Sequence, residues 1–181
     1  MKKKLFMVLL GCRPVGRLTE QHDVFFGIGS DVLSLVPAMK KFWPGVNLHI
    51  DAYQSIEIID NYTITVHEGQ FFHHDKGDLK LFFINMGGYK PPLFEEMHSK
   101  ILVVAKSISE AICIAKTDAF YVDHQNNEGR LRSHIDDKFD IDDVLNVNDL
   151  ILDYGIEIRK FANGDVTENE LKIGYIPLSN L

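Results

Sequence analysis

The sequence predicts an α+β protein with two duplicated ββαβ(β) units, packed as one pseudo-two-fold domain with mostly antiparallel sheet. Three observations lead to this prediction. Two parts of the chain align with each other without a gap, and each part starts with a short apolar run closed by Gly. A segment with helical periodicity then follows in each part. With 181 residues, of which 45% are hydrophobic, the chain is long enough to bury an ordinary core.

The aligned parts are residues 5–28 and 81–104. Their identical columns are Leu5 with Leu81, Phe6 with Phe82, Gly11 with Gly87, Glu20 with Glu96, and His22 with His98. Each part continues into a helical segment that ends in an aromatic pair, and then reaches a His-Ile-Asp tripeptide. We therefore expect a first repeat at residues 1–78 and a second at residues 79–181. A copy of roughly 75 residues has a marginal core, so both copies are expected to form one cooperative unit.

Strands are predicted where apolar or β-branched runs lack helical periodicity. These runs are residues 5–10, 22–28, 46–52 and 57–68 in the first repeat, and residues 81–86, 99–105, 155–161 and 171–178 in the second. A helix is predicted after Ser107, because Glu110 completes a capping box. The helix of the first repeat either kinks at Pro37 or begins near Ser34, so that Pro37 lies in its first turn. Residues 140–152 predict a turn of helix with acidic residues at its start.

Charge and cysteine content exclude several classes of protein. The formal net charge is −7, which opposes the phosphate contacts of a nucleic-acid-binding protein. The two cysteines, Cys12 and Cys113, are far apart, so neither a disulfide framework nor a cysteine-rich zinc site is expected. The first apolar run is too short for a signal peptide, and no run approaches the roughly 20 residues of a membrane span. We expect a cytoplasmic protein with no nucleic-acid or membrane partner.

Several phrases of the sequence resemble a known bacterial family. They are LLGCRPVGRLTEQHDVFFGIG, LVPAMKKFWP, LHIDAY, LFFINMGGY and SHIDDKF. Together they are similar to the family called domain of unknown function 1543, and they span nearly the whole chain in the expected order. This family has no established activity, so the resemblance implies no catalytic role for any residue.

Acidic and imidazole side chains recur in pairs that share one face of a strand. The candidate site residues are Glu20, His22, His49, Asp51, Glu96, His98, His134 and Asp136. Residues i and i+2 of a strand point the same way, so each repeat can assemble two imidazoles and two carboxylates. The favoured interpretation is structural: these groups hydrogen-bond to one another or to the backbone where a strand begins. General acid–base catalysis and the binding of Zn²⁺ or another divalent ion stay open as alternatives.

A weaker group of candidates lies in the loops that follow the first strand of each repeat. Arg13, Arg17 and Lys90 lie near glycines there, where an anionic group could rest on backbone N–H donors. Neither loop matches a phosphate-binding motif. Cys12 is a candidate nucleophile, but Gly88 takes its place in the second repeat, so a duplicated nucleophile is excluded.

The predicted function is a binding module for a small molecule or a protein, with a groove between the two repeats. No cofactor and no metal ion is expected for such a module, and a homodimer is compatible with the sequence. The alternative is a small-molecule enzyme that uses the Glu/His and His/Asp pairs for acid–base or metal chemistry. The sequence leaves open whether the protein is an enzyme.

Overall fold

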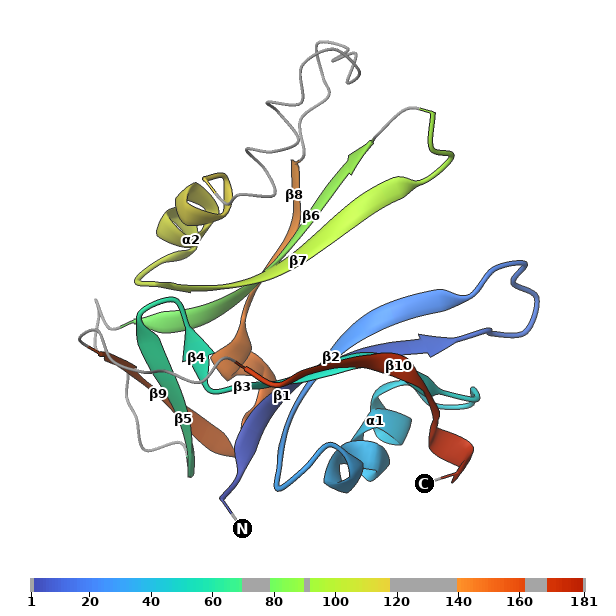
Figure 1. The fold of residues 1–181 in the computed structure, drawn as a ribbon, viewed down its shortest axis with the longest axis horizontal. Helices are drawn as coiled ribbons and strands as arrows, with labels where there is room; N and C mark the ends of the chain where they lie inside the picture. Colours follow the sequence, from blue (N-terminus) through green and yellow to red (C-terminus); the bar gives the residue numbers. More distant parts are fainter. Residues whose placement is uncertain (1, 70–78, 90–91, 118–139, 162–168, 181) are drawn as a thin grey trace. The chain divides into compact units, whose positions relative to one another are not determined.

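The computed structural model describes residues 2–69, 79–89, 92–117, 140–161 and 169–180. The chain divides into two compact units, whose elements are labelled in Figure 1. Unit 1 combines Met1–Phe72 with Leu150–Leu181, and unit 2 is His73–Asp149. Every strand pair among the described residues is antiparallel, and the α-helices are short, so the predicted α+β class with mostly antiparallel sheet is confirmed.

The larger sheet of unit 1 has four strands in the order β10-β3-β1-β2. Their bounds are β1 Lys4–Cys12, β2 Gln21–Gly29, β3 His49–Ile56 and β10 Leu171–Pro177. Strand β1 is paired on both edges and is largely buried. Its burial explains why its sequence is an apolar run rather than an alternation of apolar and polar residues.

A short helix covers one face of this sheet. The 3-10 turn Leu33–Leu35 leads into α1, Val36–Phe42. Pro37 lies in the first turn of α1, which is one of the two predicted arrangements and the one that leaves no helical hydrogen bond unmade. Met39 of α1 is fully buried in a core cluster that includes Ile50 of β3. The core of unit 1 therefore lies on the α1 side of the sheet.

A second sheet of unit 1 has the order β4-β5-β9. Its strands are β4 Ile58–Ile59, β5 Tyr62–Glu68 and β9 Tyr154–Lys160. Asn169 fastens the start of β4: its Oδ1 accepts hydrogen bonds from the backbone N–H groups of Glu57 and Ile58, at 2.8 and 3.0 Å. The Asn169 side-chain amide also donates to the Ile58 carbonyl oxygen at 2.6 Å. One side chain thus holds two segments that are far apart in sequence.

Unit 2 contains a three-stranded sheet in the order β7-β6-β8, with one helix. The elements are β6 Lys80–Tyr89, β7 Glu96–Ala105, α2 Ile108–Ala115 and β8 Asp140–Asn146. The predicted capping box is present, since Ser107 Oγ accepts a hydrogen bond from the Glu110 N–H at 3.2 Å. Ala111 and Ala115 are fully buried in the core of unit 2.

The structure corrects the predicted helical turn at residues 140–152. Residues Asp140–Asn146 form strand β8, and only the short 3-10 helix Val147–Leu150 that follows is helical. The acidic residues of this segment resemble a helix start, but β8 pairs with β6 along most of its length. Backbone pairing with a strand far away in sequence therefore outweighs the local preference.

The compact units also differ from the two predicted repeats in the C-terminal part of the chain. Strand β9 pairs with β5, and β10 pairs with β3, so both strands complete sheets of unit 1. Residues 79–181 are therefore not a compact unit by themselves. No helix among the described residues is long and apolar enough to span a membrane.

Candidate metal centre

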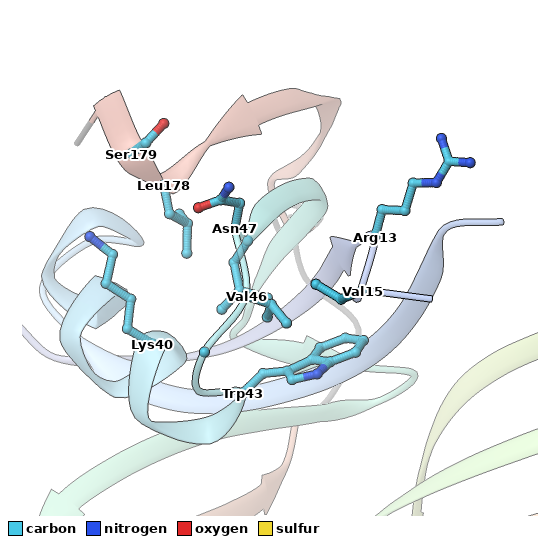
Figure 2. A pocket seen from close by; sticks show the side chains of 10 residues that line it. Arg13, Val15, Lys40, Trp43, Val46, Asn47, Leu178 and Ser179 are labelled. Atoms are coloured by element: carbon cyan, nitrogen blue, oxygen red, sulfur yellow. The ribbon is translucent and has the colours of Figure 1, made fainter. Parts of the chain in front are cut away.

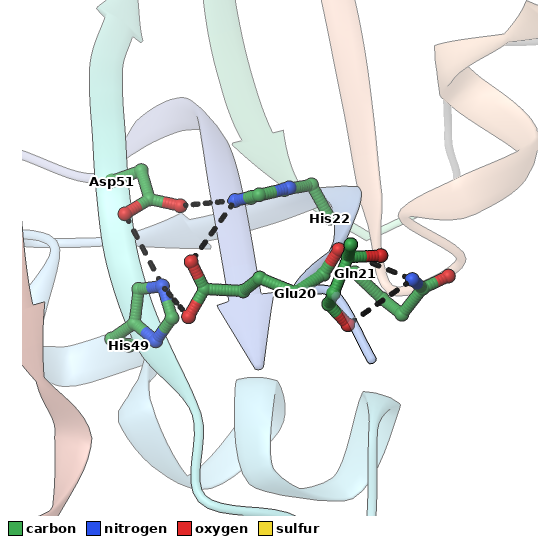
Figure 3. Close-up of polar contacts among 6 residues, drawn as sticks. Glu20, Gln21, His22, His49 and Asp51 are labelled. Carbon is green, nitrogen blue, oxygen red and sulfur yellow. Dashed lines mark hydrogen bonds and ion pairs between the residues drawn. The ribbon is translucent and has the colours of Figure 1, made fainter. Parts of the chain in front are cut away.

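Four side chains with ligand atoms meet at one end of the larger sheet of unit 1 (Figure 3). Glu20 directly precedes β2, His22 lies on β2, and His49 and Asp51 lie on β3. The residue between the last two, Ile50, is buried in the core beneath α1. Because side chains alternate along a strand, His49 lies on the opposite face of the sheet, and Asp51 contacts it there. We call Glu20, His22, His49 and Asp51 the two-histidine cluster.

Each carboxylate of the cluster offers one oxygen to each imidazole. Asp51 Oδ2 lies 3.1 Å from His22 Nε2, and Asp51 Oδ1 lies 3.2 Å from His49 Nε2. Glu20 Oε2 lies 3.9 Å from His22 Nε2, and Glu20 Oε1 lies 3.5 Å from His49 Nε2. The Nε2 atoms of both rings thus face the same pair of carboxylates, and the ring planes are nearly perpendicular, at 83°.

Two atoms of the cluster are buried and form no hydrogen bond with any described residue. They are His49 Nε2 and Asp51 Oδ2. The His49 side chain is only 4% exposed, so water does not replace the missing partner easily. A buried polar atom without a hydrogen bond costs about 1–3 kcal/mol. These two atoms lie 3.1 and 3.2 Å from their neighbours in the cluster, which are ion-pair distances without hydrogen-bond geometry.

The spacing of the ligand atoms matches the edges of a metal coordination shell. Metal–ligand bonds of about 2.1 Å place neighbouring ligand atoms roughly 3.4 Å apart in a tetrahedron and roughly 3.0 Å apart in an octahedron. Three of the N···O distances, 3.1, 3.2 and 3.5 Å, lie close to these values. Ligand atoms of Glu20, His22 and His49 all lie within 4.8 Å of one another. Glu20, His22 and His49 can therefore offer ligand atoms to one ion, with Asp51 in contact with both imidazoles.

The backbone around the cluster is shaped to leave room for it. Gly11 of β1 pairs with His22 on one side and with His49 on the other. A Cβ atom on Gly11 would overlap the His49 ring and would lie 2.7 Å from Asp51 Oδ2. The register between β1 and β3 shifts by one residue at Asp51, which forms a β-bulge. Bulges of this kind re-aim a side chain and are common beside functional sites.

The cluster is closed on one side and open on the other. His49 is buried, whereas the His22 and Glu20 side chains are 42% and 46% exposed. Tyr175 of β10 lies over the buried histidine, with 4.4 Å between the two ring centroids, and is itself exposed. Solvent or a small ligand can therefore reach the cluster from the His22 side.

Unit 2 repeats part of this arrangement. His98 of β7 lies opposite Gly87, as His22 lies opposite Gly11 in unit 1. His98 Nε2 lies 3.7 Å from Glu96 Oε2 and 3.4 Å from Asp142 Oδ2. All three side chains are about one-third exposed, and none of them has a buried atom without a hydrogen bond. In the described part of unit 2, no histidine has a buried nitrogen without a hydrogen bond, as His49 has in unit 1.

Asp142 was not among the candidate site residues named from the sequence. His134 and Asp136 were expected to match His49 and Asp51 instead. His134 and Asp136 lie outside the described residues. The tripeptide Asp140–Asp142 instead pairs with β6, and Asp142 is the bulge residue of that pairing. The sequence could have indicated this match, since Asp-Ile-Asp is identical to His-Ile-Asp at two of three positions. A duplication would explain why Asp51 and Asp142 both lie at a bulge. The duplication itself stays a prediction.

The weaker candidates take structural roles or lie outside the described residues. Arg13 donates hydrogen bonds to the carbonyl oxygens of Arg17 and Leu18, at 3.4 and 2.8 Å, and so holds its own loop together. Arg17 is exposed in that loop, and Lys90 lies outside the described residues. Cys12 is fully buried, and burial raises the pKa of its thiol, with a further rise from the Glu20 carboxylate. A buried thiol with a raised pKa is a poor nucleophile.

The family comparison falls on the part of the chain that contains the two-histidine cluster. Residues 17–66 match the model of a family described as Domain of Unknown Function (DUF1543). This match confirms the predicted resemblance. The DUF1543 segment includes the whole two-histidine cluster, from Glu20 to Asp51, and no residue of unit 2. The family description assigns no activity to it.

A similar fold occurs in a solved structure. The crystal structure of the protein Il1583 from Idiomarina loihiensis is 26% identical in sequence and superposes with a TM-score of 0.67. The alignment covers 97% of this chain and 98% of that chain, so the similarity in fold extends over nearly the whole of both chains. No curated protein matches the chain.

Proposed function

We propose that the protein binds one divalent transition-metal ion at the two-histidine cluster. The observation that carries this proposal is His49 Nε2, a buried nitrogen that faces two carboxylate oxygens without a hydrogen bond to any described residue. A neutral imidazole presents a lone pair at such a nitrogen, and a metal ion is a suitable acceptor for it. The same ion would also satisfy the buried oxygen of Asp51 and offset the two negative charges of the cluster.

The donor set indicates the kind of ion. Two imidazole nitrogens and two carboxylate oxygens suit Zn²⁺, Fe²⁺ and Mn²⁺, whereas Cu⁺ prefers thiolate and thioether sulfur. Zn²⁺ fits best, because two imidazoles and a carboxylate, the set formed by Glu20, His22 and His49, are among its usual protein environments. This proposal departs from the expectation of no metal, which depended on the hydrogen-bonded interpretation of the same side chains.

The predicted small-molecule binding module is retained as a proposal, and a metal ion gives it a chemical basis. An ion at this cluster would be approached from the side of His22 and Glu20, the two exposed ligands. A carboxylate or another oxygen donor of a small molecule could attach there as an additional ligand. The alternative of a metal-dependent enzyme uses the same open side, where an ion would lower the pKa of a bound water.

The test is a metal-binding measurement on the full chain. The protein is stripped with a chelator, reloaded with Zn²⁺, dialysed and analysed for metal, and Co²⁺ is used in parallel for its visible spectrum. We expect about one equivalent of tightly held metal per chain, and a Co²⁺ spectrum typical of nitrogen and oxygen ligands. His49→Ala and His22→Ala should lose most of this binding.

The matched control is His67→Ala, also in unit 1. His67 Nε2 contacts Glu157 Oε2 at 3.2 Å as an ordinary hydrogen bond, so this variant should retain the metal. His98→Ala serves as the control in unit 2. Binding well below one equivalent in the wild type, or equal binding in wild type and His49→Ala, would overturn the proposal.

A further inference from the structure

A pocket of about 550 Å³ lies in unit 1, at the C-terminal end of α1 (Figure 2). Four segments of the chain form it, and one of them is the loop after β1, with Arg13 and Val15. Lys40 and Trp43 come from the end of α1, Asn47 and Leu48 from the segment before β3, and Leu178 and Ser179 from the turn after β10. Its volume falls within the range of about 300–1,000 Å³ that is usual for small-molecule sites.

The floor of the pocket is apolar and firmly held. Leu48 and Leu178 are 5% and 1% exposed, and both belong to the core cluster of unit 1. The Leu178 N–H donates a hydrogen bond to the Leu48 carbonyl oxygen at 3.0 Å, which joins two of the four segments. Trp43 packs against the same core and still lines the pocket. The pocket therefore offers a rigid indole and aliphatic carbon to a ligand.

The charge at the rim of the pocket is positive. Lys40 and Arg13 are the charged residues that line it, and no carboxylate of the described residues does. Arg13 is bound to the carbonyl oxygens of its own loop, whereas Lys40 is exposed and forms no ion pair with the described residues. Positive charge here stands out in a chain with a net charge of −7. A cation beside an aromatic floor favours a ligand that is anionic at one end and flat and apolar at the other.

We propose that this pocket binds a small organic anion with an aromatic or other flat apolar part. The apolar part lies against Trp43 and Val46, and the anionic group, a carboxylate, sulfonate or phosphate, pairs with Lys40. This proposal does not depend on the metal site. Ile50 and Leu48 pack on the α1 side of the sheet, and the two-histidine cluster lies on the other face, so a variant of Lys40 leaves every metal ligand in place.

The sequence provides a reporter for the test, because Trp43 is the single tryptophan of the chain. The probe is 8-anilinonaphthalene-1-sulfonate, an aromatic sulfonate, and its desulfonated analogue N-phenyl-1-naphthylamine is the uncharged comparison. Binding in the pocket should quench Trp43 emission through contact and energy transfer, saturably. Lys40→Gln should raise the dissociation constant of the sulfonate by about threefold to fivefold, the effect of one solvent-exposed charge pair.

Two controls distinguish this proposal from general adsorption to apolar surface. Lys41→Gln removes a neighbouring charge of α1 that does not line the pocket, and should leave the dissociation constant unchanged. The uncharged analogue should bind wild type and Lys40→Gln equally, and more weakly than the sulfonate binds wild type. Probe fluorescence without quenching of Trp43, or equal effects of Lys40→Gln and Lys41→Gln on the sulfonate, would overturn the proposal.

Discussion

Gly11 lies directly opposite His49 in the pairing of β1 with β3, and a side chain at Gly11 would occupy the space of the His49 ring. Gly11→Ala is therefore expected to displace the ring, lower the stability by about 1–3 kcal/mol and remove the bound metal. Urea denaturation and metal analysis measure the two effects. Gly87→Ala is the matched change in unit 2, where it should destabilise without altering the metal content. Full metal binding by Gly11→Ala would show that His49 is not a ligand.

Asn169 is expected to contribute strongly to the stability of unit 1. Its side chain makes three hydrogen bonds to the backbone of Glu57 and Ile58, and Asn169→Ala leaves these half-buried groups without partners. We expect a loss of about 1–3 kcal/mol in denaturant unfolding. Asn169→Asp keeps the acceptor oxygen but loses the donor to Ile58, so its stability should be intermediate. Equal stability of all three proteins would contradict this role.

The two cysteines should react at very different rates. Cys12 is buried and its pKa is raised by burial, so its thiolate fraction is small, whereas Cys113 is exposed on α2. Titration of the native protein with an aromatic disulfide reagent at mildly alkaline pH should detect one fast thiol. The second should appear after unfolding in denaturant. Cys113→Ser should abolish the fast phase, and a fast phase that persists would assign reactivity to Cys12.

The ion pair between Lys3 and Glu68 should stabilise unit 1 at neutral pH and lose its effect in acid. Its N···O distance is 2.6 Å, and the hydrogen bond from Lys3 lowers the pKa of Glu68. A carboxylate whose pKa is lower in the folded state stabilises above its unfolded pKa, and the contribution disappears as the pH falls through the folded pKa.

The corresponding measurement compares the melting temperatures of wild type and Glu68→Gln over a range of pH. We expect the wild type to melt at a higher temperature at about pH 7, and the difference to vanish as the pH falls through the lowered pKa of Glu68 in the folded state. Because both side chains are exposed, high salt should also shrink the difference. A difference that is constant over this pH range would assign the effect to packing instead of charge.

Residues 1–78, the predicted first repeat, should not fold as an isolated fragment. The fragment lacks β9 and β10, so β5 and β3 would each expose an unpaired edge. We expect an insoluble product or one without a cooperative melt, because the two copies are expected to fold as one cooperative unit. Adding residues 150–181 through a short linker in place of unit 2 is the matched comparison. A cooperative melt of residues 1–78 alone would contradict the prediction.

Sequence patterns were sufficient for the elements that depend on local preference. The apolar runs of β1 and β6 and the capping box at Ser107 all lie where they were predicted. In the site, the i, i+2 spacing indicated the pair Glu20 and His22 and the pair His49 and Asp51. The two pairs meet because β1 pairs with both β2 and β3, which is a contact between distant segments.

The features that could not be predicted depend on pairing between distant segments. Strand β8 exists because β6 binds it, and Asp142 joins Glu96 and His98 only through that pairing. Tyr175 lies over His49 because β10 crosses back to β3, across more than a hundred residues of chain. The missing hydrogen bond of His49 Nε2 is likewise visible only in three dimensions. Local periodicity contains none of this information.

The return of β9 and β10 to unit 1 has a consequence for biosynthesis. Residues 73–149 leave the ribosome as one continuous stretch, so the nascent chain can complete unit 2 while the sheets of unit 1 still lack two strands. Domains generally fold as units in the order of their synthesis, but here the N-terminal segment must wait for the C-terminal one. During that interval the edges of β3 and β5 are open to other chains. Chaperone binding to translating ribosomes should therefore be strongest before residue 177, the last of β10, has emerged.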